Sequence, residues 1–141
     1  MSAKFRLIIL LFVLVYVAAC SSTSRYSKSN EKDYKNNSTR IIETERGIAS
    51  FYADEFNGKK TASGEIYDMT EMTAAHPSYP FNTVVIVTNL KNNKSVTVRI
   101  NDRMPNFKNR IIDLSLKAAE KIEMIRDGIQ EVTIEVIEWG K

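Results

Sequence analysis

An unbroken run of apolar residues near the N-terminus, Leu7 to Ala19, limits what the rest of this chain can fold into. As a helix, a run of this length would span about 20 Å, whereas the core of a bilayer needs roughly 30 Å. The basic residues Lys4 and Arg6 precede it, which is the arrangement of a secretory signal peptide. Residues 1–19 are therefore expected to direct secretion, and the folded domain must come from the remainder.

The end of this run reads Val17-Ala18-Ala19-Cys20 and contains the one cysteine of the chain. It resembles the lipobox of bacterial lipoproteins, with valine where leucine is usual. The resemblance implies cleavage before Cys20 and attachment of more than one acyl chain there, enough for stable anchoring to a membrane. An ordinary signal peptide cut after Ala19, or a signal anchor with a buried Cys20, is the alternative.

The residue after the cysteine bears on localisation. Ser21 stands where an aspartate would favour retention at the inner membrane. By the same resemblance, we expect the protein at the outer membrane, facing the periplasm, if the organism has two membranes. Otherwise it is expected on the outer face of the cell membrane.

Composition excludes several classes of function. The chain has 20 Lys and Arg against 17 Asp and Glu, and without Lys4 and Arg6 the net charge falls from +3 to +1. This near-neutral balance gives no surface for nucleic acid. One His and one Cys, far apart, cannot build a zinc site, and no glycine-rich phosphate loop is present. We expect neither a metal nor a cofactor, and a monomer that must stabilise itself by burying a core, without a disulfide.

The rest of the chain divides into two parts. Residues 20–45 are rich in Ser, Asn and Lys and carry few apolar side chains before Ile41 and Ile42. Such a segment cannot bury enough surface to order itself, so we interpret it as a disordered tether that follows the lipidated cysteine. Residues 46–141 are expected to form a single domain, which buries roughly 60% of its unfolded surface.

Secondary-structure signals in this domain are mainly those of short strands. One helix is expected from a cap at Ser115 to about Ile125, with Gly128 as its stop signal. A polar turn is expected over 89–94. Many short strands with one helix favour a mainly β fold, a small closed barrel. The expected strands cover 47–53, 83–88, 95–100 and 132–136.

The polar loops are more distinctive than the strands. Four motifs follow one another: Thr61-Ala-Ser-Gly-Glu65, Thr73-Ala-Ala-His-Pro77, Asn101-Asp-Arg-Met-Pro105 and Arg110-Ile-Ile-Asp-Leu-Ser115. In this order and spacing they resemble the rare lipoprotein A (RlpA) family over residues 47–137. The resemblance implies a six-stranded double-psi β-barrel with one or two short helices, a fold also found in expansins and family 45 endoglucanases.

The same resemblance implies a function. Members of this family are endolytic lytic transglycosylases that cleave peptidoglycan between N-acetylmuramic acid and N-acetylglucosamine, with a preference for strands lacking stem peptides. The 6-hydroxyl of the muramic acid attacks its own anomeric carbon and leaves a 1,6-anhydro end. The expected partners are therefore glycan strands, the membrane that holds the anchor, and cell-division proteins.

This chemistry needs few catalytic groups, because the nucleophile belongs to the substrate. One carboxylic acid must protonate the leaving oxygen and then accept the proton of the 6-hydroxyl, and a second negative charge stabilises the oxocarbenium-like transition state. Matching the family motifs, we expect Asp102 as acid and base, and Glu65 as the stabilising charge, although the two roles could be exchanged. His76 is the third expected catalytic residue, positioned to hydrogen-bond a carboxylate or a sugar hydroxyl.

Other residues are assigned to substrate or to structure. Arg103, Tyr52, Thr61 and Ser63 are expected to bind the glycan, whereas Asp113 is expected to be a structural carboxylate near the start of the helix. Each of these residues taken alone also has an ordinary structural explanation. Only their joint occurrence favours a site.

Two departures from the family pattern concern activity. Met104, beside the expected acid, and Asn82 both replace a usual glycine. A larger residue at 104 could narrow the cleft or restrict the backbone. The rival interpretation is therefore a noncatalytic wall-binding or division-associated lipoprotein that uses its groove only to bind, as expansins do. A hydrolase that uses water is a third.

Overall fold

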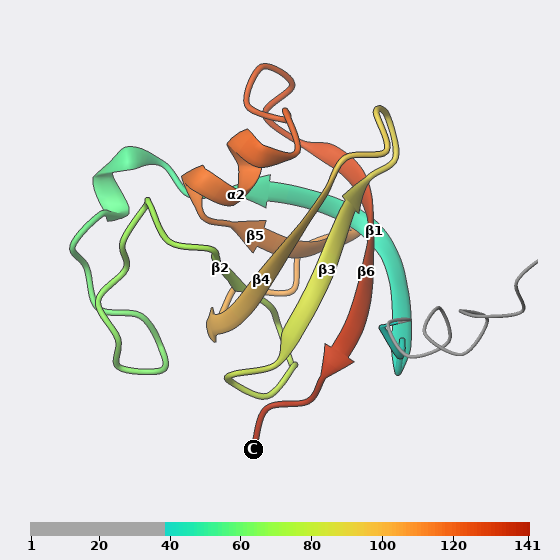
Figure 1. The fold of residues 1–141 in the computed structure, drawn as a ribbon. Coiled ribbons are helices and arrows are strands. Elements are labelled where there is room, and N and C mark those ends of the chain that lie inside the picture. The colour runs from blue at the N-terminus through green and yellow to red at the C-terminus, as the bar shows by residue number, and fades with distance from the viewer. Residues whose placement is uncertain (1–38) are drawn as a thin grey trace, which may run out of the picture. The chain divides into compact units, whose positions relative to one another are not determined.

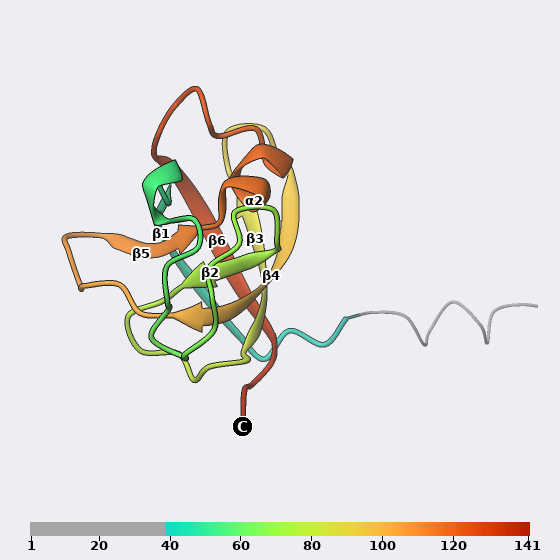
Figure 2. The same cartoon turned by 90° about the vertical axis from the view of Figure 1, so that its left-hand side faces the viewer.

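The computed structural model describes residues 39–141. Six strands close into a barrel, and one short α-helix packs against it (Figures 1 and 2). Within these residues no helix is long and apolar enough to cross a membrane. The expected signal peptide, the lipid attachment at Cys20 and the tether as far as residue 38 lie outside the described residues.

The barrel is closed in the order β1-β5-β2-β4-β3-β6. The pairs β1 with β5 and β2 with β4 are parallel, and the other pairs are antiparallel. Closure pairs every strand on both sides and leaves no free sheet edge. The elements are β1 (Glu43–Phe51), the 3-10 turn η1 (Asp54–Phe56), β2 (Thr73–Ala75), β3 (Val84–Asn89), β4 (Ser95–Asp102), β5 (Arg110–Leu114), α2 (Leu116–Lys121) and β6 (Gln130–Glu138).

Alternating apolar side chains fill the inside of the barrel. In β6, Val132, Ile134 and Val136 are fully buried, while Thr133 and Glu135 between them face outward. Successive strand residues point to opposite faces, so this alternation gives one face to the core. The mainly β class and the closed six-stranded barrel expected from the sequence are confirmed. The remaining strand residues of the core are Ala49, Ala74, Val85, Val87, Val96, Val98, Ile100, Ile112 and Leu114.

Two strands were not among the sequence expectations. β2 has three residues, too few to show alternation, and β5 reads Arg-Ile-Ile-Asp-Leu, whose charges interrupt the pattern. Both pair in parallel with a neighbour distant in the chain, and such a partner leaves no local signal. β1 begins at Glu43, three residues before the boundary expected at position 46, and ends at Phe51.

The helix begins as expected but ends early. Ser115 caps it, because its Oγ accepts a hydrogen bond from the Ala118 backbone N–H at 3.2 Å. The predicted extension to Ile125 is wrong. The helix ends at Lys121, because the carbonyl of the next residue, Ile122, is taken by the side-chain amides of Asn89 and Asn92, at 2.9 and 3.0 Å. The turn follows with Glu123 in a left-handed conformation, so Gly128 is not the stop signal.

Candidate active site

Asp102 is fixed by the strand pairing at the end of β4. There the parallel partner of Asp102 is Ala75, the last residue of β2. Its Oδ2 accepts a hydrogen bond from the Tyr52 hydroxyl at 2.6 Å, and its Oδ1 accepts from the backbone N–H groups of Ala62 and Arg103, at 2.7 and 2.8 Å. Asp102 is only partly buried as a residue. Three separate segments therefore orient this one carboxylate.

Tyr52 follows the end of β1, and contacts of both its backbone and its side chain fix its position. Its backbone N–H donates to the carbonyl of Leu114 at 3.0 Å, and its ring packs against the ring of Tyr67 with centroids 4.6 Å apart. Burial, helped by the negative charge of Asp102, raises the pKa of the Tyr52 phenol. The hydroxyl therefore stays protonated and donates to Asp102, whereas the sequence had assigned Tyr52 to the glycan.

Glu65 lies in the loop that also supplies the Ala62 donor. Its two carboxylate oxygens form a bidentate pair with the Arg99 guanidinium, at 2.7 and 2.8 Å, and the Asn101 amide donates to Oε2 at 3.0 Å. The hydrogen bonds from Arg99 and Asn101 lower the pKa of Glu65 to about 2. This carboxyl is consequently ionised at neutral pH and is unsuited to donating a proton.

Thr61 and Ser63 order this loop. Their hydroxyl oxygens lie 3.0 Å apart, the Thr61 hydroxyl donates to the carbonyl of Glu65 at 3.1 Å, and the Ser63 N–H donates to the carbonyl of Asn101 at 3.2 Å. Thr61 is buried, and Ser63 is partly exposed. Of the two, Ser63 keeps a side chain that a ligand can reach.

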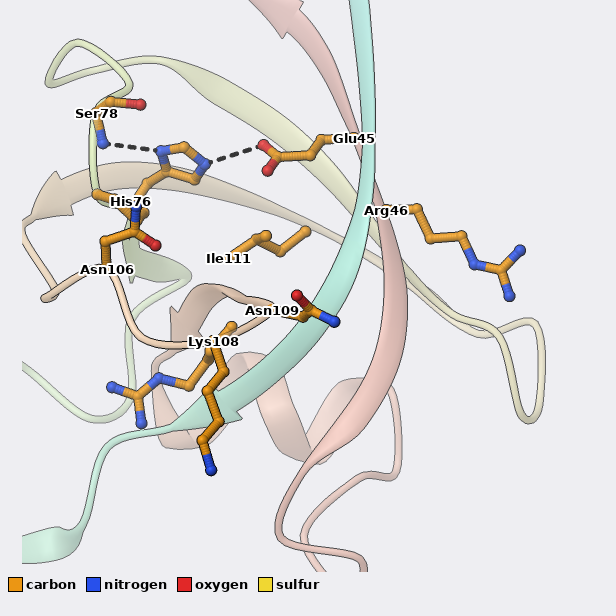
Figure 3. A pocket seen from close by; sticks show the side chains of 10 residues that line it. Glu45, Arg46, His76, Ser78, Asn106, Lys108, Asn109 and Ile111 are labelled. Carbon is orange, nitrogen blue, oxygen red and sulfur yellow. Dashed lines mark hydrogen bonds and ion pairs between the residues drawn. The ribbon is translucent and has the colours of Figure 1, made fainter.

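The imidazole of His76 hydrogen-bonds to neither Asp102 nor Glu65 and instead faces Glu45 (Figure 3). Its Nδ1 accepts from the backbone N–H groups of Ser78 and Tyr79, at 3.2 and 3.0 Å, so the hydrogen is on Nε2, which lies 3.3 Å from Oε2 of Glu45. Burial lowers the pKa of His76, an effect that Glu45 opposes only in part. The ring is thus neutral, stacked on the Tyr79 ring with centroids 3.6 Å apart.

The main chain of His76 does contact the site. Its N–H donates to the carbonyl of Asp102 at 3.2 Å, and its own carbonyl accepts from Arg103 Nη1 at 3.4 Å. The Arg103 guanidinium lies over the Phe81 ring, 3.9 Å from the centroid. Arg103 therefore joins the turn after β2 to the end of β4.

The two departures from the family pattern have different consequences. Asn82 has a φ of 67°, the left-handed region that favours glycine and that asparagine tolerates best among other residues. Met104 is not among the residues of the described chain with positive φ, and its side chain is buried. Its backbone does not need glycine, and its side chain lies in the protein interior.

The structure therefore brings Asp102, Tyr52 and the loop of Glu65 together, with His76 joined to them only through its backbone. Sequence reasoning missed Arg99, which fixes Glu65, and Glu45, the partner of the imidazole. Asp113 is structural, accepting from the Ser50 hydroxyl and lying 3.2 Å from Arg110 Nε. Within residues 39–141 no group of three or more His, Cys, Asp or Glu side chains is placed to hold a metal ion.

Comparison with known proteins gives the family. The family model described as "Lytic transglycolase" matches residues 44–134. A protein of Campylobacter jejuni named endolytic peptidoglycan transglycosylase RlpA is 51% identical over 111 residues, which cover 79% of this chain and 40% of that protein. The chain belongs to the RlpA family. A Vibrio cholerae RlpA of the same name is 50% identical, and the match covers 82% of this chain and 47% of the relative. The chain thus spans less than half the length of these two RlpA proteins.

Solved structures agree on the fold, a double-psi β-barrel. Streptomyces papain inhibitor has a TM-score of 0.57 at 21% identity, over 72% of this chain and all of that one. An expansin of Clavibacter michiganensis, solved with cellohexaose, also has a TM-score of 0.57, at 17% identity, over 68% of this chain and 51% of that one. At these identities the likeness concerns the barrel alone.

The pair between Glu65 and Arg99 should make stability depend on pH. The carboxyl has a pKa of about 2 in the folded protein against 4.5 ordinarily, so the folded state binds fewer protons and the pair stabilises above pH 4.5. That contribution is lost as the pH falls towards 2. Because the Glu65 side chain is 40% exposed, we expect about 1 kcal/mol or less. Urea unfolding of wild type and Glu65→Gln should differ at pH 7 and converge only as the pH falls to about 2, whereas exposed Glu55→Gln should match wild type throughout.

Proposed function

We propose that this protein is an endolytic peptidoglycan transglycosylase, which cleaves the bond between N-acetylmuramic acid and N-acetylglucosamine and leaves 1,6-anhydro ends. The observation that carries the proposal is the Asp102 carboxylate, oriented by three donors on a partly exposed residue, beside a loop that holds Glu65, which is ionised at neutral pH. The names of the relatives support it. Strands that lack stem peptides are the proposed substrate.

In the proposed reaction Asp102 acts first as acid and then as base. Its proton passes to the leaving glycosidic oxygen as the bond to the anomeric carbon breaks. The 6-hydroxyl of the muramic acid then attacks that carbon and gives its proton back to the carboxylate. Because a phenol can accept as well as donate a hydrogen bond, Tyr52 can face Oδ2 in both protonation states.

Glu65 is proposed to supply fixed negative charge. The oxocarbenium-like transition state is positive at the anomeric carbon, and a preorganised carboxylate lowers its energy without having to reorient. Asn101, which precedes Asp102, donates to Glu65 and so links the two acidic side chains. Because the low pKa of Glu65 leaves it ionised at neutral pH, we assign the role of proton donor and acceptor to Asp102.

The remaining predicted residues are given binding or positioning roles. Arg103 and Ser63 are partly exposed and are proposed to contact sugar hydroxyls, whereas Thr61 orders the loop. His76 is proposed to act through its backbone contact with Asp102. Action on peptidoglycan would place the protein in the cell envelope. Anchoring through Cys20, a monomeric state and contacts with cell-division proteins remain proposals from the sequence.

One substitution tests the support of the carboxylate. Tyr52→Phe keeps the ring that packs on Tyr67 and removes only the donor to Oδ2. We expect kcat to fall about tenfold, the effect of losing one hydrogen bond to a charged group, with KM little changed. Steady-state cleavage of peptide-stripped strands measures it. An unchanged kcat would remove Tyr52 from the proposed mechanism.

One digestion separates the proposed function from its rivals. Peptide-stripped glycan strands are incubated with the protein, and the products are weighed by mass spectrometry. Anhydro ends, lighter than reducing ends by one water, support transglycosylation, whereas reducing ends indicate a hydrolase. Intact strands that sediment with the protein indicate a binding module of the expansin kind and would contradict the proposal.

A further inference from the structure

A recess lies beside the imidazole of His76, and Glu45 of β1 also lines it (Figure 3). It is a cavity of about 350 Å³ between β1, the turn after β2 and the loop that runs from Arg103 to β5. That volume is at the lower end of the range for small-molecule pockets, enough for part of a sugar and its substituent. Neither Asp102 nor Glu65 lines it, so the proposed chemistry leaves it without a role.

The recess and the candidate active site share two pieces of backbone. His76, which forms one wall, donates its N–H to the carbonyl of Asp102 at 3.2 Å. The opposite wall contains Asn106, Lys108 and Asn109, from the loop that continues directly from Arg103. The recess therefore adjoins the backbone segment that carries Asp102.

The lining favours an anion. Lys108 is exposed, and none of the ion pairs within residues 39–141 includes it. Its φ of 51° is uncommon for residues other than glycine, asparagine or aspartate, so the backbone of the loop turns sharply at Lys108. Asn106 and Asn109 add amide groups, which can donate hydrogen bonds to a carboxylate.

Each of the other charged side chains of the recess lies beside a group of opposite charge or a hydrogen-bond partner. Oε2 of Glu45 lies 3.3 Å from His76 Nε2 and accepts from the Tyr79 hydroxyl at 3.1 Å. Arg46 points away from the recess, towards Glu131 at 2.9 Å (Figure 3). Arg110 lies beside Asp113, with Nε 3.2 Å from the carboxylate. Lys108, whose Nζ lies 5.1 Å from the centroid of the Phe107 ring, is thus the lining cation that has no carboxylate beside it among residues 39–141.

A glycan strand offers one kind of ionisable group. Its hydroxyl and acetamido groups are neutral, whereas the lactyl ether on O3 of muramic acid ends in a carboxyl group. That group is free and negative only where no stem peptide is attached, because a stem peptide converts it into a neutral amide. O3 is two ring carbons from the anomeric carbon, so a muramic acid held at Asp102 carries its lactyl group beside the site.

We propose that this recess binds the free lactyl carboxylate of muramic acid, with Lys108 as its counter-charge. The inference rests on the proposed function and deepens it, because it gives a physical reason for a preference for strands without stem peptides. Attachment of a peptide removes the charge that Lys108 meets.

A binding experiment that needs no catalysis tests the recess. The full chain in detergent is titrated with N-acetylmuramic acid and with N-acetylglucosamine, which lacks the lactyl group, and saturation transfer to the ligand is measured by NMR. We expect muramic acid to bind about tenfold more tightly, a preference lost in Lys108→Gln and kept in Lys108→Arg. The matched control is Lys121→Gln on α2, away from the recess, which should behave as wild type. Equal binding of the two sugars by wild type, or an unchanged preference in Lys108→Gln, would overturn the proposal.

A cleavage experiment separates failure of the recess from failure of the proposed function. Peptide-stripped strands are compared with the same strands after the lactyl carboxyl has been converted into a methyl amide. We expect wild type to cleave the charged strands with about tenfold higher kcat/KM, and Lys108→Gln to cleave both at the lower rate. If wild type cleaves both kinds of strand equally well, the proposed binding of the lactyl carboxylate is wrong, whereas the proposed function is still supported. If neither strand is cleaved, the function fails, and the NMR titration still decides whether the recess binds the carboxylate.

Discussion

Asp102→Asn is expected to lower the rate of anhydro-end formation by about three orders of magnitude, within the range that general acid–base groups contribute. The amide can neither give a proton to the glycosidic oxygen nor take one from the 6-hydroxyl. Single-turnover digestion of peptide-stripped strands, with anhydro products counted by mass spectrometry, measures the loss. Binding of the strands should persist, because the loss concerns the chemical step.

The same substitution should leave the fold intact. The asparagine Oδ1 can still accept from the N–H groups of Ala62 and Arg103, and its new Nδ2 can donate to the Tyr52 oxygen. Asp127→Asn is the matched control, since Asp127 pairs with Lys91 in a loop that contributes nothing to the site. The Tm of wild type, Asp102→Asn and Asp127→Asn should be nearly the same. Full cleavage by folded Asp102→Asn would transfer the acid role to another group.

The strands with local patterns were predictable, and those without were not. The sequence shows β-branched residues, in a run or in alternation, at β3, β4 and β6. The cap of α2 was predictable because a serine, Ser115, directly precedes the helix. β2 and β5 are strands because of distant partners, so nothing within their few residues indicates them. The early end of α2 has the same kind of cause, since Asn89 and Asn92 lie about thirty residues away along the chain.

The candidate site divides in a similar way. Asp102 and Glu65 were found from motifs, yet their different environments come from contacts that the motifs do not contain. Arg99 lies only three residues before Asp102 in the sequence. Its guanidinium nevertheless pairs with the carboxylate of Glu65 and not with that of Asp102. We expected the His76 ring to hydrogen-bond a carboxylate or a sugar hydroxyl. It does lie beside a carboxylate, but that of Glu45, a residue of β1 in a segment expected to belong to the tether. Because β1 begins in a polar stretch, before its apolar residues, the sequence gives no signal that Glu45 contacts His76.

Leu114→Ala should destabilise the domain by about 3 kcal/mol, within the range measured for Leu→Ala in cores. Leu114 is fully buried in β5, where it pairs with Phe51 of β1 and Ala74 of β2, so the cavity would open where three strands meet. We expect Tm to fall by at least about 10 °C. Its carbonyl still accepts from the Tyr52 N–H, so protein that remains folded should keep its activity.

Leu90→Ala is the matched control, because Leu90 lies in the turn between β3 and β4 and is only partly buried. Its cost should stay below about 1 kcal/mol. If the two variants lost equal stability, the register that points Leu114 into the barrel would be wrong, since a strand shifted by one residue turns every side chain to the other face. The same shift would move Tyr52 away from Asp102, because the Leu114 carbonyl holds the Tyr52 backbone. This stability measurement therefore also tests the geometry on which the proposed chemistry depends.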